Sequence, residues 1–245
     1  MSSAKVRNKS PDITGRIDAL DWSEIATALD QSGSATTGVL LTPAKCDALA
    51  RSYENGALFR SHVIMARHGF GRGEYKYFAD PLPQMISAMR GALYRHLAPT
   101  ANRWHAAMGL DERFPAEHVE FLARCHQAGQ SRPTPLLLKY VAGDYNCLHQ
   151  DLYGAHVFPL QVAFLLSRPG VDFTGGEFVM TEQRPRMQSR AHVVPLVQGE
   201  AVIFAVRHRP VQGTRGVYRV NLRHGVSVLR SGARTTLGVI LHDAQ

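Results

Sequence analysis

This chain of 245 residues lacks both long apolar runs and a set of paired cysteines. No uninterrupted apolar stretch approaches the ~20 residues that cross a bilayer, so we expect no membrane association. The polar, basic start MSSAKVRNKSPDITGR lacks the apolar segment of a secretory signal. The three cysteines, Cys46, Cys125 and Cys147, are scattered and odd in number, which argues against a disulfide framework. We therefore expect a cytoplasmic protein with a disordered N-terminus over residues 1–15.

Acidic residues are scarce in the second half of the chain. Residues 136–245 contain 12 Lys and Arg, 11 of them arginine, against 7 Asp and Glu, and the whole chain carries a net charge of +8. Such an excess of positive charge favours a polyanion or an acidic substrate as partner. A solvated basic surface without a partner is the alternative that charge alone leaves open.

The first half of the chain is predicted to be mainly helical. Thr42-Pro43 has the pattern of an N-cap followed by proline in the first turn, and it opens a helix that extends to Gly56. Apolar residues at helical spacing predict three further helices, over Trp22–Ser32, Pro81–His96 and Pro115–Gln127. Between them, Ala57–Phe78 mixes β-branched and aromatic residues around a Gly-Arg-Gly turn, which indicates a strand or hairpin.

From Thr134 onward the pattern changes to short apolar segments separated by glycine and proline. Seven segments are predicted as strands: Leu136–Val141, Val157–Ser167, Glu177–Thr181, His192–Leu196, Ala201–Val206, Tyr218–His224 and Thr235–His242. Many short strands with turns between them indicate a β-sandwich or a jelly roll. We predict an α+β fold, a double-stranded β-helix (jelly roll) with an N-terminal helical layer packed on it. Residues 16–245 would form one domain, with helical support over 16–130 and the jelly-roll core over 131–245.

His149-Gln150-Asp151, followed much later by His224, contains the residue types of a mononuclear iron site. Residues two apart on an extended segment point to the same face, so His149 and Asp151 can bind one ion. Two imidazoles and one carboxylate hold Fe(II) on one face and leave three coordination positions open. The absence of thiolate ligands argues against a structural zinc site. Arg234, ten residues after His224, is a candidate partner for the carboxylate of an organic acid.

Several ordered landmarks accompany this motif. They are Tyr140-Val-Ala-Gly143 before the histidine, the segment Phe173-Thr-Gly-Gly-Glu-Phe178, the segment Gln198-Gly-Glu-Ala-Val-Ile-Phe204, and the ending His224-Gly-Val-Ser227 with Ser231-Gly-Ala-Arg234. Together they make the segment from Leu136 to Asp243 resemble the Fe(II)/2-oxoglutarate-dependent dioxygenase superfamily. The ending resembles the prolyl hydroxylases within that superfamily.

The resemblance implies a cofactor set and roles for five residues. His149, Asp151 and His224 would bind Fe(II), while Arg234 and Tyr140 would bind the distal carboxylate of 2-oxoglutarate. O2 would be the second co-substrate. Oxidative decarboxylation of 2-oxoglutarate to succinate and CO2 would then drive hydroxylation of a substrate C–H bond. No general base is required, so we assign no catalytic residue apart from these.

Two arginine clusters follow the Gly-Gly segment and bear on the substrate. Arg184, Arg186 and Arg190 lie in the connection directly after it, and Arg207 and Arg209 lie in the next long connection. Basic loops at the rim of an active site suit phosphate contacts along a nucleic acid. The alternative is that these arginines pair with acidic neighbours or keep the rim solvated.

Three functions are consistent with these features. The first is an oxidative demethylase of alkylated nucleic-acid bases, similar in role to the AlkB-type dioxygenases, although the AlkB-type R-x-N-x-T-x-R ending is not matched. The second is a prolyl (protein or peptide) hydroxylase, which the ending from His224 to Arg234 favours. The third is a non-enzymatic binding module on a jelly roll, which the complete ligand set argues against. We favour nucleic acid because the choice of substrate should follow the surface rather than the core.

Overall fold

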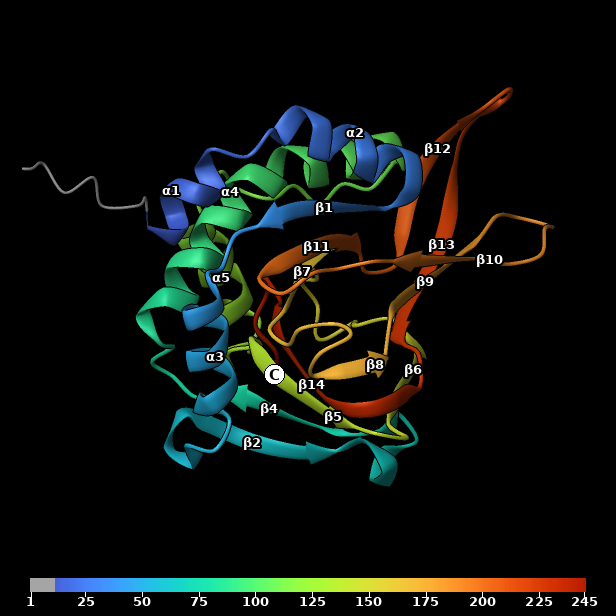
Figure 1. Cartoon of the computed structure of the whole chain (residues 1–245). Coiled ribbons are helices and arrows are strands. Elements are labelled where there is room, and N and C mark those ends of the chain that lie inside the picture. The colour runs from blue at the N-terminus through green and yellow to red at the C-terminus, as the bar shows by residue number, and fades with distance from the viewer. Residues whose placement is uncertain (1–11) are drawn as a thin grey trace, which may run out of the picture.

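The computed structural model describes residues 12–245, and five helices lie along the first half of this range (Figure 1). They are α1 (Ile13–Asp18), α2 (Trp22–Ser32), α3 (Pro43–Ser52), α4 (Gln84–Ala107) and α5 (His118–Gln127). The Thr42 side chain accepts a hydrogen bond from the Lys45 amide and Pro43 occupies the first turn of α3, as its sequence predicts. None of the described helices is both long and apolar enough to span a membrane.

Helix α4 is longer than the sequence indicates, because it continues through Pro99. A proline inside a helix removes one backbone hydrogen bond and costs about 3 kcal/mol. Here the apolar stripe continues on both sides of it, with Leu97, Ala101 and Trp104 all buried in the core. Burial of this stripe outweighs the cost of the proline, so the predicted end at His96 is wrong.

The strands of the described chain form two antiparallel sheets. The larger sheet has the order β1-β11-β7-β14-β5-β4-β2, with β8 paired to β14. Its strands are β1 (Ser34–Val39), β2 (Phe59–Ile64), β4 (Glu74–Phe78), β5 (Leu136–Val141), β7 (Leu160–Leu165), β8 (Phe173–Gly175), β11 (Glu200–Ala205) and β14 (Leu229–Val239). Strand β7 is buried at all six positions, as expected for a strand in the middle of a covered sheet.

The smaller sheet has the order β10-β9-β13-β6-β3, with β12 paired to β13. Its strands are β3 (Gly71–Arg72), β6 (Tyr145–His149), β9 (Phe178–Gln183), β10 (Arg190–Val194), β12 (His208–Gly213) and β13 (Gly216–Val226). Burial alternates along β9, so that Phe178, Met180 and Glu182 face inward. The predicted α+β class and jelly-roll architecture are confirmed.

One apolar core joins the helices to the sheets. Ile86, Leu93 and Trp104 of α4 pack in the same cluster as Phe164 of β7 and Leu237 of β14. The helical layer therefore covers the outer face of the larger sheet, while its inner face is turned toward the smaller sheet (Figure 1).

Two predicted boundaries need correction. Helix α1 begins at Ile13, so residues 12–15 are ordered, while the rest of the predicted disordered start, residues 1–11, lies outside the described residues. The segment 16–130 is also less purely helical than expected, since it supplies β1, β2 and β4 to the larger sheet and β3 to the smaller one. Strand β1 pairs with β11 and so covers an edge that would otherwise expose unpaired backbone groups.

Two buried histidines make stability depend on pH. Burial and, to a lesser extent, the nearby Arg90 guanidinium lower the pKa of His118 and of His242 to about 4. The unfolded chain has ordinary histidines with pKa values near ~6.5, so it binds more protons than the folded chain below that pH. Stability is therefore lost as pH falls below about 6.5.

We expect the free energy of unfolding, measured by urea titration, to fall between pH 6.5 and 5 by at most about 1.4 kcal/mol per pH unit for each histidine. The ring of His118 lies 2.8 Å from the Leu241 carbonyl, to which it donates. The variant His118→Gln keeps a donor there without a titrating ring, so its profile should be flatter. A variant profile as steep as that of the unaltered chain would rule out His118 as the source.

Candidate metal centre

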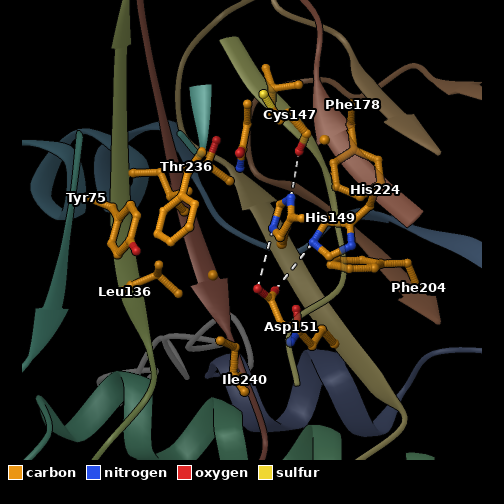
Figure 2. Close-up of a pocket in the computed structure, with 18 of the residues that line it drawn as sticks. Tyr75, Leu136, Cys147, His149, Asp151, Phe178, Phe204, His224, Thr236 and Ile240 are labelled. Carbon is orange, nitrogen blue, oxygen red and sulfur yellow. Dashed lines mark hydrogen bonds and ion pairs between the residues drawn. The ribbon is translucent and has the colours of Figure 1, made fainter. Parts of the chain in front are cut away.

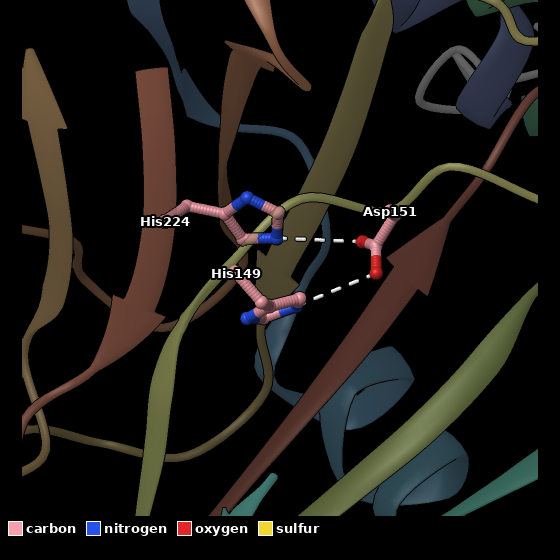
Figure 3. A group of neighbouring side chains, drawn as sticks. All are labelled: His149, Asp151 and His224. Atoms are coloured by element: carbon pink, nitrogen blue, oxygen red, sulfur yellow. Dashed lines mark ion pairs between the residues drawn. The ribbon is translucent and has the colours of Figure 1, made fainter. Parts of the chain in front are cut away.

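The three predicted metal ligands lie together between the two sheets (Figure 3). One possible ligand atom from each of His149, Asp151 and His224 falls within 4.8 Å of the other two. The Nε2 atoms of both histidines lie 3.4 Å from the Asp151 carboxylate, each facing a different oxygen. Such a convergent set of two imidazoles and one carboxylate fits a divalent metal ion.

Strand pairing and two side-chain contacts orient the first histidine. His149 of β6 is the cross-strand partner of His224 of β13, so the two rings stand side by side, with centroids 4.3 Å apart. The Nδ1 atom of His149 lies 2.8 Å from the Cys147 carbonyl and donates to it, which leaves Nε2 free to bind a metal. Gln150, which lies between the two candidate ligands, is held in place because its side-chain amide donates to the Asn221 side chain and to the Leu222 carbonyl.

Tyr153 positions the carboxylate. Its hydroxyl donates to Asp151 Oδ1 at 2.7 Å, a contact that the sequence gave no reason to expect. Burial alone would raise the pKa of Asp151, but the neighbouring His149 and His224 rings hold this pKa well below its usual range. The carboxylate is therefore charged at neutral pH, as a metal ligand must be.

Aromatic side chains enclose His224, which is buried. Its ring centroid lies 4.5 Å from that of Phe204 and 6.0 Å from that of Phe178, with Phe178 stacked nearly parallel. Burial lowers the pKa of His224, so the ring is neutral and able to bind a metal. Both phenylalanines belong to segments that the sequence singled out, and their role is to pack against this ligand.

A cavity of about 350 Å³ opens beside the three ligands (Figure 2). Its walls come from the inner faces of both sheets. The larger sheet contributes Tyr75, Tyr77, Leu136, Leu138, Tyr140, Gln161, Arg234, Thr236 and Ile240, among others. The volume is in the range of small-molecule sites.

Arg234 is a buried cation that has no acidic partner within the described residues. Its side chain is 2% exposed and donates to Thr236 Oγ1 at 2.6 Å, while its Nε makes no hydrogen bond. No described carboxylate lies within salt-bridge distance of it, and burial lowers its pKa. A buried charge is costly unless paired, so this guanidinium is suited to an anion that enters the cavity.

Tyr140 lies next to this guanidinium and faces the same cavity. It is the cross-strand partner of Arg234 on β5, and the guanidinium lies 5.7 Å from the centre of its ring. Burial raises the pKa of Tyr140, so the hydroxyl is a donor at neutral pH. This buried hydroxyl has no hydrogen-bond partner of ordinary geometry among the described residues. The nearby Asn146 side chain offsets a small part of the rise in its pKa. Tyr140 and Arg234 thus present a hydroxyl donor and a guanidinium donor to the same cavity.

The Gly-Gly segment leaves space beside this pair. Gly176 has a φ of +63°, and a Cβ atom at this position would lie 2.0 Å from Leu229 Cδ1 and 3.2 Å from Arg234 Cδ. A larger residue would be strained in this left-handed conformation and would also press on both side chains. The segment is therefore a tight turn whose glycine allows close packing against Arg234.

The predicted arginine rim divides into two groups. Arg209 is buried, at 2% exposed, and its guanidinium lies 2.5 Å from the equally buried carboxylate of Glu182, so placing it on an exposed rim was wrong. Arg184 and Arg190 also contact Glu182, at 2.8 and 3.5 Å. Of the five, only Arg186 and Arg207 are exposed and form no ion pair with another described residue. Glu182 lies two residues before Arg184, but its contact with Arg209 depends on how the fold places β9 and β12, which the sequence does not show.

Comparison with known proteins places the chain in a family. Residues 73–244 match the Oxygenase-NA family, which is described as an oxygenase catalysing oxidative methylation of damaged DNA. The chain belongs to this family of oxygenases. The matched range contains all three candidate metal ligands together with Tyr140 and Arg234.

One relative and two solved structures extend the comparison. A protein of Mycobacterium tuberculosis strain H37Rv, named Uncharacterized protein Rv2227, is 49% identical over 167 residues, which cover 68% of this chain and 72% of that protein. A Pseudomonas putida prolyl-4-hydroxylase matches with a TM-score of 0.53 and 15% identity, over 89% of this chain and 96% of that one. A prolyl 4-hydroxylase from Phytophthora capsici matches with a TM-score of 0.54 and 15% identity, over 97% and 68%.

These findings bear on the predictions from sequence. Family membership confirms an oxygenase, and the likeness to the two prolyl 4-hydroxylases shows that the chain shares their fold. The His-Asp-His group fits the predicted Fe(II), and 2-oxoglutarate and O2 stay predictions.

The contact between Tyr153 and Asp151 yields a test of metal binding. The variant Tyr153→Phe loses the hydroxyl that holds the carboxylate, and outer contacts of this kind change metal affinity by about 10- to 100-fold. We expect weaker binding of Mn(II), measured by electron paramagnetic resonance titration. Tyr75→Phe is the matched control, since Tyr75 lines the same cavity but the hydroxyl bound to Asp151 belongs to Tyr153. Equal Mn(II) affinity in Tyr153→Phe and the unaltered chain would contradict this role.

Proposed function

We propose that this oxygenase is an Fe(II)/2-oxoglutarate-dependent dioxygenase that hydroxylates a C–H bond and releases succinate and CO2. The observation that carries the proposal is the unpaired, buried Arg234 in the same cavity as the His149, Asp151 and His224 group. A metal site next to a buried cation suits a co-substrate that has a chelating end and a distal carboxylate. 2-Oxoglutarate has both.

The residues present fit the two groups that this function requires. The Nε2 atoms of His149 and His224 and the carboxylate of Asp151 would hold Fe(II). Arg234 would form a charge-assisted pair with the distal carboxylate of 2-oxoglutarate, and Tyr140 and Thr236 would contribute hydroxyl groups. When bound, the iron supplies oxygen activation, in which one oxygen atom of O2 enters succinate and the other enters the substrate.

The protein itself contributes binding, orientation and shielding. Arg234 and Tyr140 fix one end of the co-substrate, and Tyr153 keeps the carboxylate ligand in place. Phe178 and Phe204 exclude water around His224. Apolar and aromatic side chains line the rest of the cavity, which limits the access of water to a reactive centre.

For the substrate, we propose an alkylated base of a nucleic acid. Hydroxylation of an N-methyl group gives an unstable adduct that releases formaldehyde and restores the base. The family description, which names damaged DNA, supports this choice, as do the net charge of +8 and the exposed Arg186 and Arg207. Tyr75 and Tyr77 line the cavity and offer rings against which an extruded base could stack.

Hydroxylation of a peptide is the second candidate. The likeness in fold to two prolyl 4-hydroxylases and the ending from His224 to Arg234 favour it. Substrate choice depends on the surface around the site more than on the core, and this surface is basic. We therefore place peptides second.

The role of Arg234 can be tested by binding alone. In Arg234→Gln the cationic partner of the co-substrate is lost, and truncation of one member of a buried charge pair costs about 2–5 kcal/mol. We expect at least a roughly thirtyfold weaker affinity for 2-oxoglutarate, measured calorimetrically on the Mn(II)-loaded protein without O2. Arg230→Gln, an exposed position on the same strand, should bind normally. If both variants bind 2-oxoglutarate like the unaltered chain, the assignment of Arg234 is wrong.

A product assay separates the two substrate classes. With Fe(II), 2-oxoglutarate and O2, methylated DNA, tested both as a single strand and as a duplex, should stimulate succinate formation and release formaldehyde, and both should decline steeply as salt rises. Asp151→Ala, which lacks the carboxylate ligand, should form neither product. Stimulation by a proline-containing peptide together with indifference to methylated DNA would favour the second candidate instead.

A further inference from the structure

Two β-hairpins extend from the smaller sheet beyond the body of the molecule (Figure 1). One is formed by β9 and β10, and the other by β12 and β13, which pair from His208 and Asn221 out to Gly213 and Gly216. Both project on the side away from helices α3 and α5 (Figure 1). Residues 184–189 and 214–217, at and near their tips, are mostly exposed, so the outer parts of the hairpins add little to the core.

These hairpins are strongly basic. Residues 183–199 contain three arginines and no acidic residue, and residues 207–226 contain five arginines and no acidic residue. Arg186, Arg207, Arg215 and Arg223 are exposed, and no carboxylate of the described residues lies within salt-bridge distance of them. In contrast, Arg95, Arg103 and Arg168 elsewhere each pair with an aspartate.

The bases of the two hairpins are tied together. Glu182 of β9 contacts Arg209 of β12 at 2.5 Å, and both side chains are 2% exposed. The Arg209 guanidinium also donates to the Asp30 carbonyl at the end of α2. The inner arginines thus brace the hairpins against each other and the body, and the outer arginines remain available to a partner.

We propose that the two hairpins form a clamp for the sugar-phosphate backbone of duplex DNA beside the lesion. This inference rests on the proposed function for its choice of nucleic acid. Exposed guanidinium groups without acidic partners suit phosphates, which arginine binds in bidentate fashion. The outer hairpin segments 183–190 and 207–217 contain no phenylalanine, tyrosine or tryptophan, and the adjacent Tyr218 is only partly exposed, so they offer little of the stacking surface of single-strand binding proteins. A two-stranded β-ribbon also fits a groove of duplex DNA.

The clamp is continuous with the metal centre. Strand β13 contains His224 near one end and Gly216 at the hairpin tip, and the exposed Arg223 lies beside His224 on the outer face of the strand. At ~3.3 Å per residue, the strand from Arg215 to His224 spans about 30 Å, which approaches the ~34 Å of one duplex turn. A DNA backbone bound along this strand therefore lies at a fixed distance from the cavity. One base can then be extruded into the cavity while the neighbouring bases stay paired.

The test is duplex binding by fluorescence anisotropy, with the anaerobic holoenzyme and a fluorescein-labelled 20-base-pair DNA containing one methylated base. The hairpin variant combines Arg186→Gln, Arg207→Gln and Arg215→Gln, none of which contacts Glu182. Each lost phosphate contact lowers the slope of log affinity against log salt by about 0.9. We expect the slope to fall by about three and the affinity at 0.1 M salt to fall on the order of a hundredfold.

The matched control removes the same charge from the helical layer, with Arg51→Gln, Arg95→Gln and Arg103→Gln, all exposed. It should bind duplex DNA almost as well as the unaltered chain. Three results would each overturn the clamp: no duplex binding by the unaltered chain, equal losses in both variants, or polyglutamate binding that matches DNA binding and needs the same arginines. Because no O2 is present, a failure of the proposed demethylation appears only in the product assay and leaves this result unaffected.

Discussion

The antiparallel pairing of β6 with β13 is the constraint on which the site depends. It sets His149 opposite His224, two residues far apart in the sequence, and places Asp151 just beyond the end of β6. The register is held by Gln150, which donates across to Asn221 and Leu222. A one-residue shift would turn one histidine away from the cavity, because side chains alternate between the faces of a strand. The metal centre is thus a product of strand register as much as of residue identity.

The jelly-roll core contains two buried arginines, one in the cavity and one at the base of the hairpins. In the cavity, Arg234 has no acidic neighbour at salt-bridge distance within the described chain, so a ligand has to supply the negative charge. At the base of the hairpins, Arg209 is equally buried but has Glu182 as its partner. A buried arginine is therefore a candidate ligand-binding group in the cavity and a member of a structural ion pair at the base of the hairpins. Burial of either guanidinium carries a desolvation penalty. The presence of a carboxylate partner offsets it at Arg209, and the absence of one marks Arg234 as the candidate for binding an anion.

Sequence patterns predicted the elements whose apolar spacing is strong. Helix α2 and strand β5 have the predicted bounds, and the seven predicted strands all correspond to strands of the sheets. Strands β6 and β12 were missed for physical reasons. Tyr145–His149 is only partly buried and forms a strand because it pairs with β13 and β3, while β12 contains Pro210, which is tolerated because β12 pairs with β13 alone. Such elements depend on neighbours that are distant in the sequence.

The residue types alone were sufficient to predict a metal ligand set from His149, Asp151 and His224 and an anion partner in Arg234. Which other side chains surround these residues depends on the fold. Tyr153 became a partner of Asp151, Phe178 and Phe204 became walls around His224, and Arg209 became an internal brace instead of a rim residue. The reason is that ligand identity is local to a residue, whereas burial, pairing and exposure depend on which strands the fold brings together.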